Sequence, residues 1–225
     1  MSIEPTPIDA ELAAYILAHA SGRDEALKRV EEQTAAMGSI VMMQTAPEQA
    51  AFLEMLVRTV GARLALEVGT FTGYGAIRIA RGLTPGGKLI CFELEQERAD
   101  IARANLDEAG VGEQTEIVVG PAIEGLRALP DEAAVDFAYL DADKTGYPDY
   151  YEELVSRLAS GGLLAIDNVF MGGRILDPDP DEGTAAVQVL NQRILEDDRV
   201  DSVMLAMADG LTLVRRGGKL ALMGS

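Results

Sequence analysis

The sequence predicts an α/β fold built on a doubly wound, mostly parallel sheet of seven strands. From residue 61 onward, short apolar runs bounded by turn residues alternate with helical patterns, whereas the first 60 residues carry helical patterns alone. An Asp-Gly pair separates the last two apolar runs, which is typical of a β-hairpin. At 225 residues the chain is expected to form one domain, 1–225, with a helical N-terminal cap over 1–60 and a core over 61–225.

The cap begins with two helix-start signals. In Thr6-Pro7-Ile8-Asp9 we expect Thr6 to be the N-cap and Pro7 the first helical residue. In Thr45-Ala46-Pro47-Glu48 we expect Thr45 to be the cap, with Glu48 at the capping-box position. This second helix would run on to a stop at Gly61.

The core is predicted to alternate strands with helices. Five apolar runs predict buried parallel strands over 63–68, 88–93, 115–120, 135–142 and 162–168. The patterns between and after them predict helices over 75–82, 95–109, 123–128, 147–159 and 184–196. The runs 200–207 and 211–216 flank Asp209-Gly210 and predict one antiparallel pair that closes the sheet.

Charge and cysteine content narrow the class of protein. Nineteen Lys and Arg against 37 Asp and Glu leave a net charge of −18, so nucleic acid and anionic membranes are not expected partners. No apolar stretch is long enough to span a bilayer, and the first residues lack the basic start of a signal peptide. With Cys91 as its one cysteine, the chain is expected to be cytoplasmic.

Ligands of open α/β sheets bind at the carboxyl ends of the strands, and the first such end is rich in glycine. Phe71 and Tyr74 stand where the dinucleotide fingerprint needs glycine, which argues against a pyrophosphate cradle. Glu67, just before the first glycine, suits an amine or hydroxyl ligand. Glu93 ends the second strand and favours ribose hydroxyls, hence a nucleoside. The alternative interpretation of the glycine-rich turn is tight packing, and that of Glu93 is a solvated acid at the end of a strand.

The fourth and fifth strands both deliver polar side chains to the same edge. Asp141, Asp167 and Asn168 could converge there, because neighbouring strands lie about 4.8 Å apart. Hard oxygen ligands favour Mg²⁺, with Ca²⁺ or Mn²⁺ possible, over zinc or copper. In the alternative, Asp167-Asn168 caps a turn and Asp141 pairs with Lys144.

Four segments carry a family resemblance. In order along the chain, they resemble the cation-dependent class I O-methyltransferases of the caffeoyl-CoA and catechol group, which use S-adenosylmethionine: MQTAPEQAAFL (43–53), LEVGTFTGYGA (66–76), YLDADKTGYPDYYE (139–152) and IDNVFMGGRI (166–175). The resemblance implies a Rossmann-like methyltransferase core that covers the chain from about residue 40 to its end.

The resemblance also implies roles for individual residues. The residues expected to bind the cofactor are Met43, Thr45, Glu67, Gly69, Thr70, Gly75, Glu93, Ala122 and Asp141. Asp141, Asp167 and Asn168 would hold the metal, and Lys144 would be catalytic together with Asp141 and Asn168. Gly75 departs from the serine usual in the family, so only a backbone contact is expected there.

The implied reaction is Mg²⁺-dependent methyl transfer to a hydroxyl of a small catechol-type phenolic. Lys144 would act either as the base or as a charge that stabilises the phenolate. A free phenolic is favoured over a coenzyme A ester, because only Arg23, Lys28 and Arg29 could form a basic patch near the N-terminus. A homodimer is expected, mainly by resemblance. The alternatives are an NAD-dependent oxidoreductase and a non-catalytic S-adenosylmethionine-binding protein.

Overall fold

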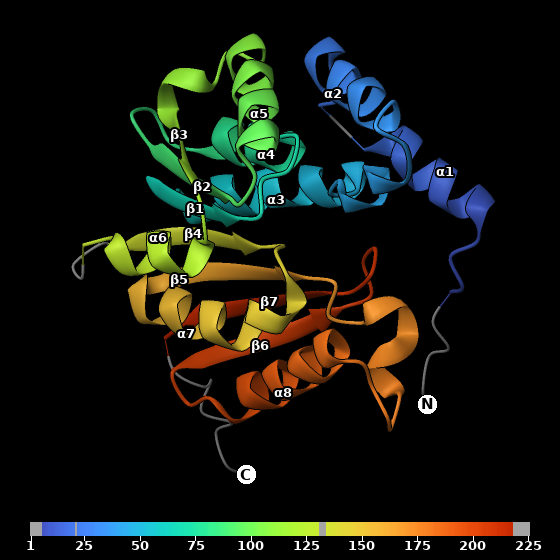
Figure 1. Cartoon of the computed structure of the whole chain (residues 1–225), viewed down its shortest axis with the longest axis vertical. Coiled ribbons are helices and arrows are strands. Elements are labelled where there is room, and N and C mark those ends of the chain that lie inside the picture. Colours follow the sequence, from blue (N-terminus) through green and yellow to red (C-terminus); the bar gives the residue numbers. More distant parts are fainter. Residues whose placement is uncertain (1–5, 21, 131–133, 218–225) are drawn as a thin grey trace.

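The computed structural model describes residues 6–20, 22–130 and 134–217. They form one seven-stranded sheet in the order β3-β2-β1-β4-β5-β7-β6 (Figure 1). The strands are β1 (Leu64–Val68), β2 (Lys88–Glu93), β3 (Thr115–Val119), β4 (Val135–Leu140), β5 (Leu158–Asp167), β6 (Val200–Leu205) and β7 (Leu211–Arg216). The predicted fold class, with its parallel sheet and C-terminal antiparallel hairpin, is confirmed.

The pairing brings the strand ends to one edge. Leu66 at the middle of β1 faces Ile90 on β2 and Ala138 on β4, both in parallel register. Strand β7 runs antiparallel to both β5 and β6, so the last strand of the hairpin is the inner one. The carboxyl ends of β1 to β5 therefore lie side by side at the centre of the molecule.

Helices cover both faces of the sheet (Figure 1). They are α1 (Ala10–His19), α2 (Glu25–Ala35), α3 (Pro47–Val60), α4 (Tyr74–Gly82), α5 (Gln96–Glu108), α6 (Ala122–Ala128), α7 (Tyr147–Arg157) and α8 (Glu182–Glu196). One buried apolar cluster joins the sheet to α6, α7 and α8, and a second joins the opposite face to α2, α3, α4 and α5. Among the described residues, no helix is long and apolar enough to cross a membrane.

Two predicted helix caps were wrong. Asp9, not Thr6, caps α1, because its carboxylate accepts a hydrogen bond from Leu12 N at 2.9 Å and an acid is favoured at the positive helix end. Helix α3 begins after Ala46 with no side-chain cap. Thr45 instead turns its hydroxyl toward the buried Tyr139 hydroxyl, 3.4 Å away.

The end of one predicted helix was also misplaced. Helix α7 ends at Arg157 rather than at 159, because the buried Leu158 begins β5 and pairs with Val135. The expected stop at Gly61 is confirmed, and this glycine adopts the left-handed conformation (φ 66°) that ends α3.

Candidate active site

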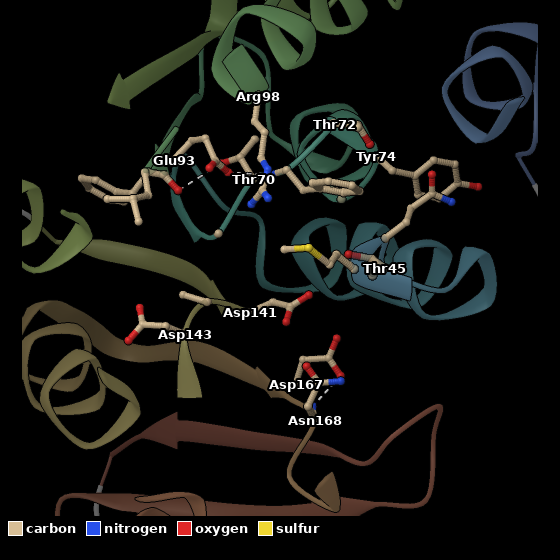
Figure 2. Close-up of a pocket in the computed structure, with 18 of the residues that line it drawn as sticks. Thr45, Thr70, Thr72, Tyr74, Glu93, Arg98, Asp141, Asp143, Asp167 and Asn168 are labelled. Carbon is tan, nitrogen blue, oxygen red and sulfur yellow. Dashed lines mark hydrogen bonds between the residues drawn. The ribbon is translucent and has the colours of Figure 1, made fainter. Parts of the chain in front are cut away.

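The central cavity has a volume of about 950 Å³ and opens at the carboxyl ends of β1 to β5 (Figure 2). The loops after these strands line it, together with the 3-10 helix η1 (Gly38–Met43) and the hairpin turn at Ala208 and Asp209. The sequence-predicted site residues that line it are Met43, Thr45, Gly69, Thr70, Gly75, Glu93, Ala122, Asp141, Lys144, Asp167 and Asn168. Glu67 is not among the lining residues, but it lies buried next to Gly75, which does line the cavity.

A close approach between two loops makes glycine necessary at residue 69. Gly69 has φ 93°, and a Cβ built there would lie 2.0 Å from the backbone oxygen of Asp141. The loops after β1 and β4 are therefore in backbone contact, which only glycine permits.

Glu67 is a buried acid with one unpartnered oxygen. Its side chain is 1% exposed, and Oε2 has no hydrogen-bond partner in the described structure. Burial raises the pKa of Glu67 to about 8, with smaller contributions from the charges of Asp141 and Glu93. A cationic donor placed at Oε2 would satisfy this oxygen and favour the charged form.

Glu93 is held at the end of β2 by two backbone amides. Its Oε2 accepts from Phe71 N at 2.8 Å, and its Oε1 accepts from Glu95 N at 3.1 Å. The Arg98 guanidinium lies 5.5 Å from the centre of the Phe71 ring. The carboxylate of Glu93 is thus fixed in orientation between the β1 loop and α5.

Asp141 and Asp167 reach the cavity from neighbouring strands, with Asn168 beside them (Figure 2). Asp167 is 4% exposed, and burial, followed by the charge of Asp141, raises its pKa to about 6. Asn168 adopts φ 57°, a left-handed conformation that asparagine tolerates. No group of three or more His, Cys, Asp or Glu that could hold a metal occurs among the described residues. Asp141, Asp167 and Asn168 offer two carboxylates and one amide at the cavity wall.

Lys144 is fixed by three acceptors. Its Nζ donates to Asp141 Oδ1 at 3.0 Å, to the Ala142 backbone oxygen at 3.0 Å and to the Tyr147 hydroxyl at 2.7 Å. The Asp141–Lys144 pair, which the sequence left as an alternative to a metal site, is therefore present. This pair engages Oδ1 of Asp141 and leaves the carboxylate at the wall of the cavity.

Comparisons with known proteins identify the family of this chain. The family model described as O-methyltransferase matches residues 17–217. The chain belongs to this O-methyltransferase family. A probable caffeoyl-CoA O-methyltransferase 1 of Dictyostelium discoideum is 34% identical over 180 residues, 78% of each chain. Tricin synthase 1 of Oryza sativa subsp. japonica is 36% identical over 188 residues, 77% of this chain and 75% of the relative.

Solved structures support the same family. The O-methyltransferase TomG from Streptomyces achromogenes, in complex with SAM, has a TM-score of 0.86 at 31% identity and covers 92% of this chain and 96% of its own. The O-methyltransferase from Bacillus cereus, in complex with SAH, also has a TM-score of 0.86, at 29% identity, and covers 92% and 97%. The predicted enzyme class, an S-adenosylmethionine-dependent O-methyltransferase, is confirmed, and the oxidoreductase alternative is not favoured.

Sequence reasoning missed several residues of this O-methyltransferase site. Gln49 and Tyr139 both contact Asp167, and Tyr150 donates to Asp143 Oδ1 at 2.7 Å at the cavity wall. Gln49 could have been found from sequence, because it is a polar residue on the apolar face of a predicted helix. The two tyrosines carry no such signal, since aromatic residues in a strand or a helix are ordinary core residues.

Proposed function

We propose that this chain transfers a methyl group from S-adenosylmethionine to a hydroxyl of a small catechol-type phenolic, with a divalent cation at the acceptor end of the cavity. The observation that carries the proposal is the pair of carboxylates, Asp141 and Asp167, which face one cavity beside Lys144 and Asn168. The charge of Asp141 contributes to the raised pKa of Asp167, so the two acids repel each other, and a bound cation would relieve that repulsion.

The buried acids of the first two strands fit the cofactor. Glu67 offers an unpartnered oxygen, which suits the amino group of S-adenosylmethionine, and Glu93 suits the ribose hydroxyls. Backbone at Gly69 and Thr70 would approach the cofactor closely. The remaining contacts are proposed for Met43, Thr45, Gly75, Ala122 and Asp141, which all line the cavity.

The metal ligands would be Asp141, Asp167 and Asn168. Carboxylate and amide oxygens are the ligands that Mg²⁺ prefers, and Ca²⁺ or Mn²⁺ would fit the same set. A bound cation would lower the pKa of the acceptor hydroxyl and would help to orient a catechol.

Lys144 is placed to act on the acceptor oxygen from the cavity wall. Its Nζ makes three hydrogen bonds as donor, and the Tyr147 hydroxyl among them donates onward to the Asp167 backbone oxygen at 3.2 Å. Three acceptors around Nζ match the three donors of an ammonium group. This arrangement supports a charge that stabilises the phenolate over a base. The acceptor hydroxyl would release its proton to water, and its oxygen would bond to the methyl carbon as the sulfur–methyl bond breaks, which would give the methyl ether and S-adenosylhomocysteine.

A methyl-transfer assay tests the proposal. S-adenosylmethionine and a panel of catechols are incubated with the protein in Mg²⁺ or in EDTA, and methylated product is measured. Turnover that EDTA abolishes and Mg²⁺ restores is expected. Turnover unaffected by EDTA would contradict the metal role, and cofactor binding without turnover would favour a non-catalytic binding protein.

A matched pair of variants localises the effect. Asp167→Asn should lose metal-dependent turnover, whereas Asp100→Asn should keep it, because Asp100 is an exposed residue of α5 paired with Arg103. Equal activities of the two variants would contradict the assignment of Asp167.

We also propose a homodimer that forms in the cytoplasm. Helix α1 buries no residue, and its Tyr15 and Ile16 are 61% and 37% exposed. On the hairpin, Val203 and Met204 of β6 are 50% and 46% exposed. The buried thiol of Cys91 is compatible with a reducing compartment. Light scattering should give the mass of a dimer, and Tyr15→Glu should shift it toward the monomer. An unshifted mass would contradict the role of α1.

A further inference from the structure

A closed triangle of buried polar groups lies between α3 and the sheet. The Tyr139 hydroxyl lies 2.6 Å from Asp167 Oδ2, Gln49 Nε2 lies 2.7 Å from the same oxygen, and Gln49 Nε2 lies 3.0 Å from the Tyr139 hydroxyl. Gln49 and Tyr139 are fully buried, and Asp167 is 4% exposed. Burial of polar groups is costly unless they are paired, and these hydrogen bonds pair the Tyr139 hydroxyl, Asp167 Oδ2 and Gln49 Nε2, whereas Gln49 Oε1 has no partner in the described structure.

The chemistry of the three groups settles the direction of each hydrogen bond. An ionised carboxylate only accepts, so the tyrosine hydroxyl and the Gln49 amide nitrogen both donate to Oδ2. The second hydrogen of the Gln49 amide donates to the Tyr139 oxygen. Both lone-pair sites of Asp167 Oδ2 are thereby used. In the described part of the chain, Oδ1 accepts only from Asn168 N, at 2.7 Å, and keeps acceptor capacity.

The two donors are also neutral. A lysine or arginine in their place would orient Asp167 but would cancel its charge. Tyrosine and glutamine orient the carboxylate and leave its negative charge for a cation. Asp141 differs, because its partner is the ammonium group of Lys144. The two carboxylates are therefore held by different means, and Asp167 is the one whose charge no side-chain cation in this set neutralises.

We propose that Gln49 and Tyr139 are positioning residues, which hold Asp167 so that Oδ1 is presented as a metal ligand. This inference rests on the metal role in the proposed function. Hydrogen-bond partners of metal ligands commonly contribute 10–100-fold to metal affinity. Gln49 lies on α3, so the helical cap takes part in building the metal end of a site otherwise made by the sheet. The Thr45 hydroxyl, 3.4 Å from the Tyr139 hydroxyl, connects the triangle to the cofactor end.

The test is a titration with Mn²⁺ of the full chain saturated with S-adenosylhomocysteine, read by the electron paramagnetic resonance of free Mn²⁺. Tyr139→Phe and Gln49→Met should each weaken Mn²⁺ binding about 10-fold. The double variant should lose less than the product of the two, because both donors serve one oxygen. Affinity for S-adenosylhomocysteine should stay within about twofold of wild type. High Mg²⁺ should restore kcat, so the defect appears in the KM for the metal.

Tyr151→Phe is the matched control. It removes a tyrosine hydroxyl that also donates to an aspartate, Asp197 Oδ2 at 3.0 Å, but neither residue lines the cavity. Its Mn²⁺ affinity should equal that of wild type. Thermal melting shows whether each variant folds. If Gln49→Met does not fold, Tyr139→Phe, which keeps the aromatic ring, is sufficient for the test.

Three outcomes would overturn the inference. Wild-type Mn²⁺ affinity in Tyr139→Phe would do so and leave the proposed function intact. An equal loss of Mn²⁺ and S-adenosylhomocysteine binding would show a purely structural role. If the wild-type chain binds no Mn²⁺, the metal role in the proposed function fails first, and this inference fails with it.

Discussion

The carboxylate of Glu67 occupies the space that a side chain at residue 75 would need. Oε1 of Glu67 lies 2.6 Å from the position of a Cβ built on Gly75, and Thr45 Oγ1 lies 3.3 Å from it. Real Cβ atoms essentially never approach another atom below 3.0 Å. The absence of a side chain at residue 75 therefore allows Glu67 to take its observed position.

Gly75→Ala is expected to destabilise the protein. Alanine in a helix is favoured over glycine by about 0.5–1 kcal/mol, but forced contact in a packed core costs about 1–3 kcal/mol. We expect a net loss of about 1 kcal/mol in the free energy of unfolding. Chemical denaturation measures it.

Gly183→Ala provides the matched control for that substitution. Gly183 also lies in a helix, α8, but a Cβ there meets its nearest atoms at 3.6 Å, an ordinary contact distance. This variant should be as stable as wild type or slightly more stable. A Gly75→Ala protein that is also more stable would show that Glu67 moves aside at no cost.

The pH dependence of stability should report the protonation of Glu67. Burial raises its pKa from 4.5 to about 8, so between these values the native state holds a proton that the unfolded chain has released. The contribution of Glu67 to the free energy of unfolding is therefore fully present below pH 4.5 and is lost as the pH rises through about 8. Glu67→Gln should remove this loss, whereas Glu116→Gln, at an exposed acid, should not. Denaturant unfolding measured across that pH range tests this prediction. If the free energies of unfolding of wild type and Glu67→Gln changed in parallel with pH, the raised pKa of Glu67 would be refuted.

Substitutions of Lys144 should separate its two proposed roles. Lys144→Met removes the charge and should lower kcat by about 10²–10³, the usual loss of one electrostatic stabiliser. Lys144→Arg keeps a permanent charge that cannot act as a base at neutral pH. It should therefore keep more activity than Lys144→Met if the charge is what matters. Equal inactivity of both variants, with unchanged affinity for S-adenosylhomocysteine, would assign Lys144 as the base.

The charge of the chain should disfavour a coenzyme A ester as the acceptor. The three candidate cations are each paired with an acid: Arg23 with Glu31, Lys28 with Glu25 and Arg29 with Glu108. Repulsion between a chain of net charge −18 and a polyanionic ester should weaken as salt screens it. We expect kcat/KM for caffeoyl-CoA to rise with ionic strength and that for a free catechol to stay level. A fall with salt for the ester would indicate a basic docking site.

The polar residues at the strand ends could be predicted from the sequence, because each one directly follows an apolar run. Asp141 and Asp167 follow apolar runs, and the parallel sheet that those runs predict brings its carboxyl ends together. The contacts of Gln49 and Tyr139 were not readable, since they depend on the angle at which α3 crosses the sheet. The cap at Thr45 failed for the same reason, because a tertiary contact with Tyr139 replaced a local one. Local pattern likewise predicted the hairpin but not which of its strands is inner.

The inner position of β7 has a consequence for the order in which the chain can fold during synthesis. Leu211–Arg216 is the last strand described, yet it provides the pairing for the outer edge of β5 and for β6. Until this segment leaves the ribosome, β5 presents an open edge and β6 has no neighbour in the sheet. The nascent chain therefore carries an unprotected edge strand next to Asp167 until Arg216 has been made, and this exposed edge favours aggregation during synthesis.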